Sequence, residues 1–268
     1  MTVERIRNSA GNALKKSISI LLMKRILGFL SAVALGAVMF AAPVKAQIAP
    51  EYGPLLKKYV SDRGVNYGAW KANAADVAAL QKVVDSIARA PASAAVTPEQ
   101  LAFHLNAYNA WILHQKVAAY PGEMSPGMLT FVLPYFNRKQ ITVAGEQMSF
   151  NHLESDIIRP RFKDPRIHFA LNCASISCPP LFNEPFEARQ LNPQLDGLAK
   201  RFVNSERGVK PSADGKSVKL SKIFDWYKDD FAPSGGAVAF INKFRTQKIP
   251  ATASVGFQDY YWKLNDAK

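Results

Sequence analysis

The chain has 268 residues, of which 48% are hydrophobic and 21% are charged. This composition excludes a disordered or fibrous protein and is typical of a folded globular one. Its 15 glycines and 17 prolines follow no fixed period, so a repeat architecture is also excluded, and the length predicts one domain of ordinary size.

The formal net charge of +13 would favour a nucleic-acid partner if the charge were spread over the folded part. However, residues 1–46 contain seven of the basic side chains and only one acidic side chain, Glu4. Residues 47–268 then carry 27 basic and 20 acidic side chains, a net charge of +7. This remainder does not require nucleic acid, and we expect none as a partner.

The N-terminal segment has the pattern of a secretory signal peptide. Lys24 and Arg25 precede an apolar run over residues 26–42, and Ala46 offers a small residue for cleavage before Gln47. The run is shorter than the ~20 residues that a spanning helix needs, so we expect cleavage and no stable membrane span. The mature chain, 47–268, is expected to be periplasmic or secreted. Because Met23 begins this pattern, residues 1–22 are either a longer n-region or an over-extended N-terminus.

Hydrophobic spacing and capping residues predict helices and short strands along the mature chain. Apolar residues recur at helical spacing over 52–60, and Asn73 is a suitable cap for the next helix. The predicted helices cover residues 52–60, 73–90, 97–119, 149–160, 192–202, a segment after Ser221, and 237–245. The predicted strands cover residues 141–143, 147–148, 166–171, 217–220, 254–257 and 260–262.

The helix over residues 97–119 has apolar residues on every side, which is typical of a helix surrounded by protein. Asn106 and Asn109 nevertheless lie inside it, and burying an unpaired amide costs about 1–3 kcal/mol. Their side chains must therefore find partners, either in neighbouring backbone or in a polar cleft. Because helices come first and strands follow, the fold class is expected to be α+β. We expect a single domain in which further helices and this long buried helix pack on a small, mainly antiparallel sheet.

Residues 166–181 hold both cysteines of the chain together with His168, and no other segment is so rich in reactive groups. One alternative is a disulfide between Cys173 and Cys178, which is plausible outside the cytoplasm. A second makes Cys173 a nucleophile whose proton is removed by His168. A third is a zinc site, although the segment offers no obvious fourth ligand. The last alternative is a pair of inert thiols.

Acidic and basic residues of the preceding helix add to this candidate site. Glu154 is the nearest acid able to orient the His168 imidazole. A cluster of basic residues, including Arg159 and Arg166, would lower the pKa of a nearby thiol and attract an anionic substrate, unless it is simply a solvated surface.

At these residues the chain resembles a bacterial and plant family known as domain of unknown function 547. The resemblance rests on residues 166–175 followed by Cys178-Pro-Pro-Leu, and it extends to 106–110, 153–159, 224–231 and 260–265. It therefore covers roughly residues 51–265. Two positions depart from the family pattern: His104 stands where the family usually shows Trp or Phe, and Tyr261 stands where it usually shows Asp.

The resemblance implies a family without an established reaction. The chain is also loosely similar to papain-like and transglutaminase-like folds, in which the nucleophilic cysteine opens the long helix. Here the long helix has no cysteine, and both thiols follow the histidine.

Together these observations favour an exported thiol-dependent hydrolase or acyl transferase acting on an amide or thioester. His168, Cys173 and Glu154 are its catalytic candidates, and a small molecule or peptide is its substrate. Neither a cofactor nor a metal is expected. The binding candidates are Asn106, Arg159, Arg166 and Cys178. The alternative is a noncatalytic binding or structural module that is stabilised by a Cys173–Cys178 disulfide.

Overall fold

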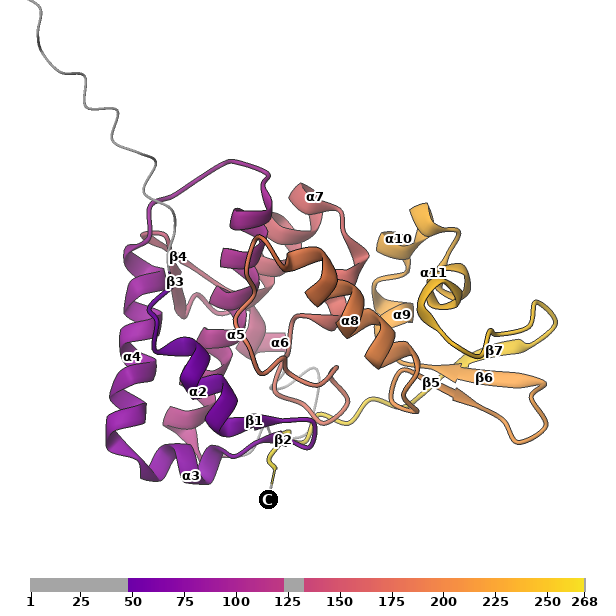
Figure 1. The fold of residues 1–268 in the computed structure, drawn as a ribbon, viewed down its shortest axis with the longest axis horizontal. Coiled ribbons are helices and arrows are strands. Elements are labelled where there is room, and N and C mark those ends of the chain that lie inside the picture. The colour runs from indigo at the N-terminus through magenta and orange to yellow at the C-terminus, as the bar shows by residue number, and fades with distance from the viewer. Residues whose placement is uncertain (1–47, 123–132, 268) are drawn as a thin grey trace, which may run out of the picture. The chain divides into compact units, whose positions relative to one another are not determined.

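The computed structural model describes residues 48–122 and 133–267 (Figure 1). The predicted signal peptide and its cleavage position lie outside these residues. In the described part of the chain, no helix is both long enough and apolar enough to cross a membrane.

Four helices form the N-terminal part, and their ends follow the capping residues of the sequence. Asn73 accepts a hydrogen bond from the backbone of Asp76, and Thr97 accepts one from Gln100, as their positions predict. The predicted helices over 52–60, 73–90 and 97–119 are confirmed, and a short helix between the first two was not predicted. The four helices are α2 (Tyr52–Tyr59), α3 (Tyr67–Ala72), α4 (Ala74–Arg89) and α5 (Pro98–Ala119).

Helix α5 lies within the protein, and α3, α4 and the π-helix η2 (His152–Ile158) pack against it. All ten residues from 101 to 110 are buried, which confirms the prediction from its all-round apolar pattern. The two buried amides are satisfied by backbone. Asn106 exchanges two hydrogen bonds with Phe186, and Asn109 bonds to the carbonyl of Ala170 and the N–H of Asn172.

The strands form three small sheets within the described residues, and two of these sheets are antiparallel pairs. In the third sheet, β6 pairs antiparallel with β5 and parallel with β7. The α+β class is therefore confirmed, although the expected sheet is divided into three. The strands are β1 (Val60–Ser61), β2 (Gly64–Val65), β3 (Ile141–Val143), β4 (Glu146–Met148), β5 (Val209–Pro211), β6 (Ser217–Leu220) and β7 (Ser254–Phe257).

The remaining helices are mostly short. Helix α8 packs against η3 and α11, and α10 packs against α9 and α11 (Figure 1). They are α6 (Leu133–Asn137), α7 (Arg159–Phe162), η3 (Pro165–Phe169), α8 (Leu191–Val203), α9 (Ile223–Trp226), α10 (Lys228–Phe231), η4 (Ala232–Ser234) and α11 (Ala237–Phe244).

Three local predictions are wrong. Residues 166–171 do not form a strand, because Asp164 caps a 3₁₀ helix, η3, that begins at Pro165. Pro160 does not end the preceding helix: η2 continues directly into α7, and Ile158 and Arg159 both keep a right-handed helical backbone. Residues 260–262 are irregular rather than extended in a sheet.

Candidate ligand-binding pocket

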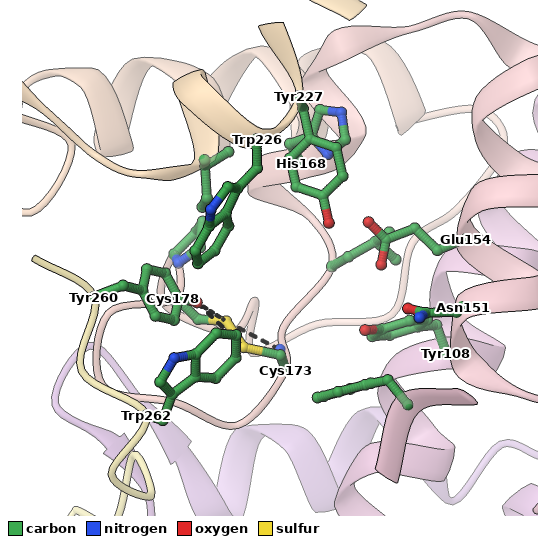
Figure 2. Close-up of a pocket in the computed structure, with 14 residues that line it drawn as sticks. Tyr108, Asn151, Glu154, His168, Cys173, Cys178, Trp226, Tyr227, Tyr260 and Trp262 are labelled. Atoms are coloured by element: carbon green, nitrogen blue, oxygen red, sulfur yellow. Dashed lines mark hydrogen bonds between the residues drawn. A yellow bond between two sulfur atoms is a disulfide. The ribbon is translucent and has the colours of Figure 1, made fainter. Parts of the chain in front are cut away.

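A pocket of about 260 Å³ lies beside the cysteine loop (Figure 2). Its walls come from α5, α6, η2, η3, α9 and the C-terminal segment, and most of the side chains are aromatic or apolar. The lining residues are Tyr108, Phe136, Asn151, Glu154, His168, Leu171, Cys173, Cys178, Pro179, Ile223, Trp226, Tyr227, Tyr260 and Trp262.

Glu154 supplies the carboxylate of this pocket and is only 8% exposed. It lies on the π-helix η2, a rare element that often occurs at functional sites because it displaces side chains from the regular helical register. The Tyr227 hydroxyl points toward the carboxylate (Figure 2). Burial, and then the charge of Glu154, raises the pKa of Tyr227, which keeps this phenol protonated as a donor.

His168 is held by a network that runs away from the cysteines. Its Nε2 lies 2.7 Å from Asp230 Oδ2, and its ring stacks on Tyr227 at 3.9 Å between centroids. Arg159 donates two hydrogen bonds to the same carboxylate, at 2.6 and 3.0 Å. The His168 side chain is 1% exposed, so its orientation is fixed by these contacts.

Asp230 is the charged centre of this network. Burial alone would raise the pKa of its carboxyl, but the hydrogen bonds from His168 and Arg159 outweigh burial and hold the pKa well below its usual value. Asp230 therefore remains ionised at neutral pH.

Three aromatic rings form one wall of the pocket. Trp226 stacks on Trp262 at 5.8 Å between centroids, and Tyr260 lies 4.8 and 4.6 Å from these two rings. Figure 2 shows this wall on one side of the disulfide, with Glu154 and Asn151 on the other. The pocket is therefore aromatic on one side and polar on the other.

Backbone contacts between the cysteine loop and the C-terminal segment position two of these rings. Ile176 N donates to Lys263 O, Asn265 N donates to Ala174 O, and Tyr261 N donates to Ser177 Oγ. Tyr260 and Trp262 are thereby held beside the loop although they are more than 80 residues away along the chain.

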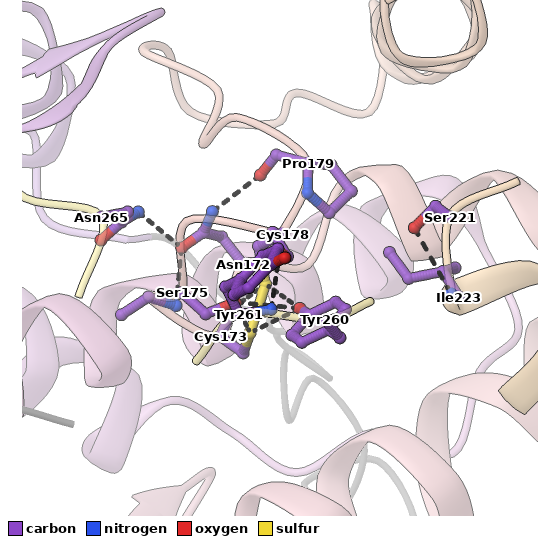
Figure 3. Close-up of a disulfide and its surroundings, with 12 residues drawn as sticks. Asn172, Cys173, Ser175, Cys178, Pro179, Ser221, Ile223, Tyr260, Tyr261 and Asn265 are labelled. Carbon is purple, nitrogen blue, oxygen red and sulfur yellow. Dashed lines mark hydrogen bonds between the residues drawn. A yellow bond between two sulfur atoms is a disulfide. The ribbon is translucent and has the colours of Figure 1, made fainter. Parts of the chain in front are cut away.

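Cys173 and Cys178 form a disulfide (Figure 3). The Tyr260 hydroxyl lies 3.1 Å from Cys178 Sγ and 3.3 Å from Cys173 Sγ. Asn172 joins both ends of the loop, because its side chain donates to Pro179 O and accepts from Ala174 N. Ala174 has a left-handed backbone with φ 65°, which is uncommon for a residue with a side chain and indicates a tightly constrained loop.

Of the four alternatives for the cysteines, the structure contains the first, a disulfide. Both sulfurs are bonded to each other, so neither is a free thiol or a zinc ligand in this structure. His168, Glu154, Cys173 and Cys178 do line the same pocket, as the clustering in the sequence indicates. The acid that contacts His168, however, is Asp230 rather than Glu154.

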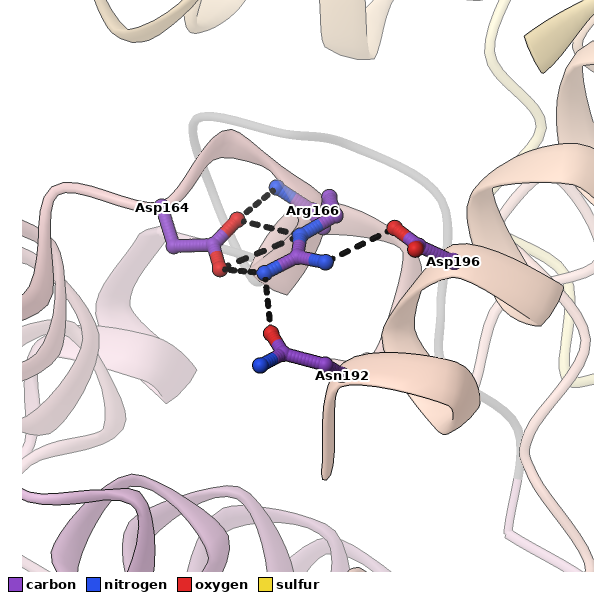
Figure 4. Close-up of polar contacts among 4 residues, drawn as sticks. All are labelled: Asp164, Arg166, Asn192 and Asp196. Atoms are coloured by element: carbon purple, nitrogen blue, oxygen red, sulfur yellow. Dashed lines mark hydrogen bonds and ion pairs between the residues drawn. The ribbon is translucent and has the colours of Figure 1, made fainter. Parts of the chain in front are cut away.

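The other binding candidates lie outside this pocket. Asn106 is occupied by the backbone of Phe186, as described above. Arg159 reaches His168 through Asp230, and its guanidinium lies 4.9 Å from the centroid of the Tyr227 ring. Arg166 pairs with Asp164 and Asp196 and donates to Asn192 (Figure 4). Most of the basic cluster is thus engaged in contacts within the protein.

Sequence reasoning missed Asp230 and the aromatic wall as site residues. Asp230 is 62 positions from His168, and nothing in the local pattern pairs them. The aromatic motifs at 224–227 and 260–262 enter the sequence analysis through the family resemblance and, for 260–262, as a predicted strand, but not as site residues. Their concentration of aromatic residues is the signal that could have identified the wall.

His104 and Tyr261, the two residues that depart from the family pattern, lie in different surroundings. His104 is 6% exposed, lies beside Phe103 and Phe162, and has no hydrogen-bond partner for either ring nitrogen among the described residues. Burial, and then Arg161, lowers the pKa of His104 to about 4, so a neutral ring occupies this aromatic position. Tyr261 is 60% exposed and does not line the pocket.

The fold and the pocket define a mixed α+β domain with an aromatic and acidic pocket beside a disulfide loop. Residues 92–203 match the family model described as "Protein of unknown function, DUF547". No curated protein and no solved structure matches the chain.

Proposed function

We propose that the mature chain is an exported binding module that holds a small organic ligand in this pocket. The observation that carries the proposal is a buried carboxylate, Glu154, facing an aromatic wall across a single cavity. Cavities of a few hundred Å³ with apolar walls and few polar groups are typical of ligand sites. The disulfide and the Asp230 network support the proposal because they fix two sides of the cavity before a ligand arrives.

Binding is favoured over nucleophilic attack for two reasons. A thiol nucleophile must be a thiolate with a base within hydrogen-bond reach, and here the Cys173 sulfur is bonded to Cys178. The expected base, His168, has its Nε2 engaged by Asp230.

A thiol-dependent hydrolase or acyl transferase is the second candidate. It is supported by the position of Cys173, whose sulfur lines the pocket and lies 3.3 Å from the hydroxyls of both Ser175 and Tyr260. Hydroxyl groups at these positions would stabilise a thiolate after reduction. This candidate requires free thiols in the resting protein.

The binding proposal predicts saturable quenching of tryptophan fluorescence by at least one compound in a panel of small amines, acids, sugars and amides. Trp262→Ala removes one ring of the wall and should weaken that binding about tenfold or more, because stacking and apolar burial are lost together. Tyr261→Ala is the matched control, since this neighbouring aromatic residue is exposed and does not line the pocket.

The proposal fails if no compound in the panel binds the disulfide-bonded protein. It also fails if Trp262→Ala, shown to be folded by circular dichroism, binds as tightly as the wild type.

A further inference from the structure

We infer that the ligand of this pocket carries an organic ammonium group, with Glu154 as its counter-ion and the rings of Trp226, Tyr260 and Trp262 around its alkyl substituents. The inference rests on the proposed binding function and names the class of ligand. It is carried by the charges, the ring faces and the size of the pocket.

Among the described residues, no cation is in contact with the acidic side of the pocket. Arg159 donates both of its hydrogen bonds to Asp230, and its charge acts on Glu154 only from a longer distance. The Tyr227 hydroxyl points toward Glu154, which makes no ion pair with any described residue. None of the described residues that line the cavity is a Lys or an Arg. Because a buried carboxylate is costly unless it is paired, a cationic ligand would supply the missing partner.

The aromatic wall fits the rest of such a ligand. The faces of Trp and Tyr rings attract ammonium ions through their quadrupole, and Trp attracts them most strongly. Several rings arranged around an acid form the kind of cage that recognises alkylated ammonium groups. Here Trp226, Tyr260 and Trp262 stand across the cavity from Glu154 (Figure 2).

The size and chemistry of the cavity argue against a sugar. About 260 Å³ is small for a ligand site, so the bound group has few atoms. A polyhydroxylated ring of that size would need a hydrogen-bond partner for each hydroxyl. Apart from phenol and indole groups, the described side chains of the walls offer only the Glu154 carboxylate, the Asn151 amide and the His168 ring. The Asn151 amide already donates to Asn137, and His168 Nε2 is already engaged. The rest of the cavity wall is apolar, which suits alkyl groups attached to the ammonium nitrogen of a ligand.

The test uses the disulfide-bonded mature protein and a pair of probes with nearly the same shape. Choline carries a trimethylammonium group, and 3,3-dimethyl-1-butanol has a neutral carbon in place of the nitrogen. We expect calorimetric titration to show choline binding about tenfold or more tightly than the neutral probe. Equal affinity for the two probes, or no binding of choline, would overturn the inference.

Glu154→Gln keeps the shape of the side chain and removes its charge. This variant should bind choline less tightly than the wild type does, and its preference for choline should shrink to what the aromatic rings alone supply, whereas its affinity for the neutral probe should be unchanged. Glu146→Gln, at an exposed position outside this pocket, is the matched control and should bind choline as the wild type does. Undiminished choline binding by Glu154→Gln would exclude Glu154 as the counter-ion. The comparison of the two probes on wild-type protein stands even if the variant fails to fold.

The outcomes separate the two proposals. If the neutral probe or another uncharged compound binds as well as choline and Trp262→Ala weakens both, the ammonium inference fails and the binding function stands. If nothing binds the pocket, both fail.

Discussion

Asp230 controls how the polar side of the site is arranged at the scale of single residues. It receives hydrogen bonds from Arg159 and lies 2.7 Å from His168 Nε2, and His168 in turn packs on Tyr227. The Tyr227 hydroxyl in turn points toward Glu154. Loss of Asp230 would leave a half-buried guanidinium without its partner and release the imidazole.

We therefore expect Asp230→Asn to lower the free energy of unfolding by about 1–3 kcal/mol at pH 7. The pKa of Asp230 is lower in the folded state than in the unfolded chain, so its contribution is fully present above pH ~4 and is lost as the pH falls further, towards the folded-state pKa. Urea unfolding of the wild type and of Asp230→Asn, from pH 7 down to pH 2, measures the difference in their free energies of unfolding. It should be largest at neutral pH and shrink in acid.

Asp229→Asn is the control, because this neighbouring carboxylate is exposed and makes no ion pair with any described residue. A stability difference for Asp230→Asn that does not change with pH would contradict the assigned role of its charge.

At the scale of elements, helix α5 positions the cysteine loop through a single amide. Asn109 donates to Ala170 O at 2.8 Å and accepts from Asn172 N at 3.0 Å, and Asn172 begins the loop that holds the disulfide. The buried helix and the site are thereby joined directly.

Asn109→Ala should destabilise the protein by about 2–4 kcal/mol, since it leaves a buried carbonyl and a buried N–H unpaired and opens a small cavity. Guanidinium unfolding monitored by circular dichroism measures the change. Asn137→Ala removes an exposed amide that bonds to Asn151, and it should cost well under 1 kcal/mol. Similar costs for the two variants would show that Asn109 does not link the helix to the loop.

Capping residues in the sequence predicted where two helices begin. The caps at Asn73 and Thr97 gave the starts of α4 and α5 because a side chain next to the helix satisfies its first N–H groups. Residues 166–171 were misread because β-branched and aromatic residues also suit a buried 3₁₀ turn, and the Asp164-Pro165 start signal was not recognised.

At the scale of the whole molecule, the pocket is assembled from segments between Tyr108 and Trp262. The concentration of His168, Cys173 and Cys178 in one segment predicted one side of it. The pairing of His168 with Asp230, and the position of Trp226 and Trp262 opposite Glu154, arise from tertiary contacts that no local spacing encodes.

The central claim is that this pocket has a closed disulfide in its wall and binds rather than attacks its ligand. Mass measurement after iodoacetamide treatment, on mature protein from its native compartment, tests this claim most directly. We expect no adduct before reduction and two adducts after it, one on Cys173 and one on Cys178. Prompt adducts on both cysteines without reductant would contradict the account and favour the thiol-dependent enzyme.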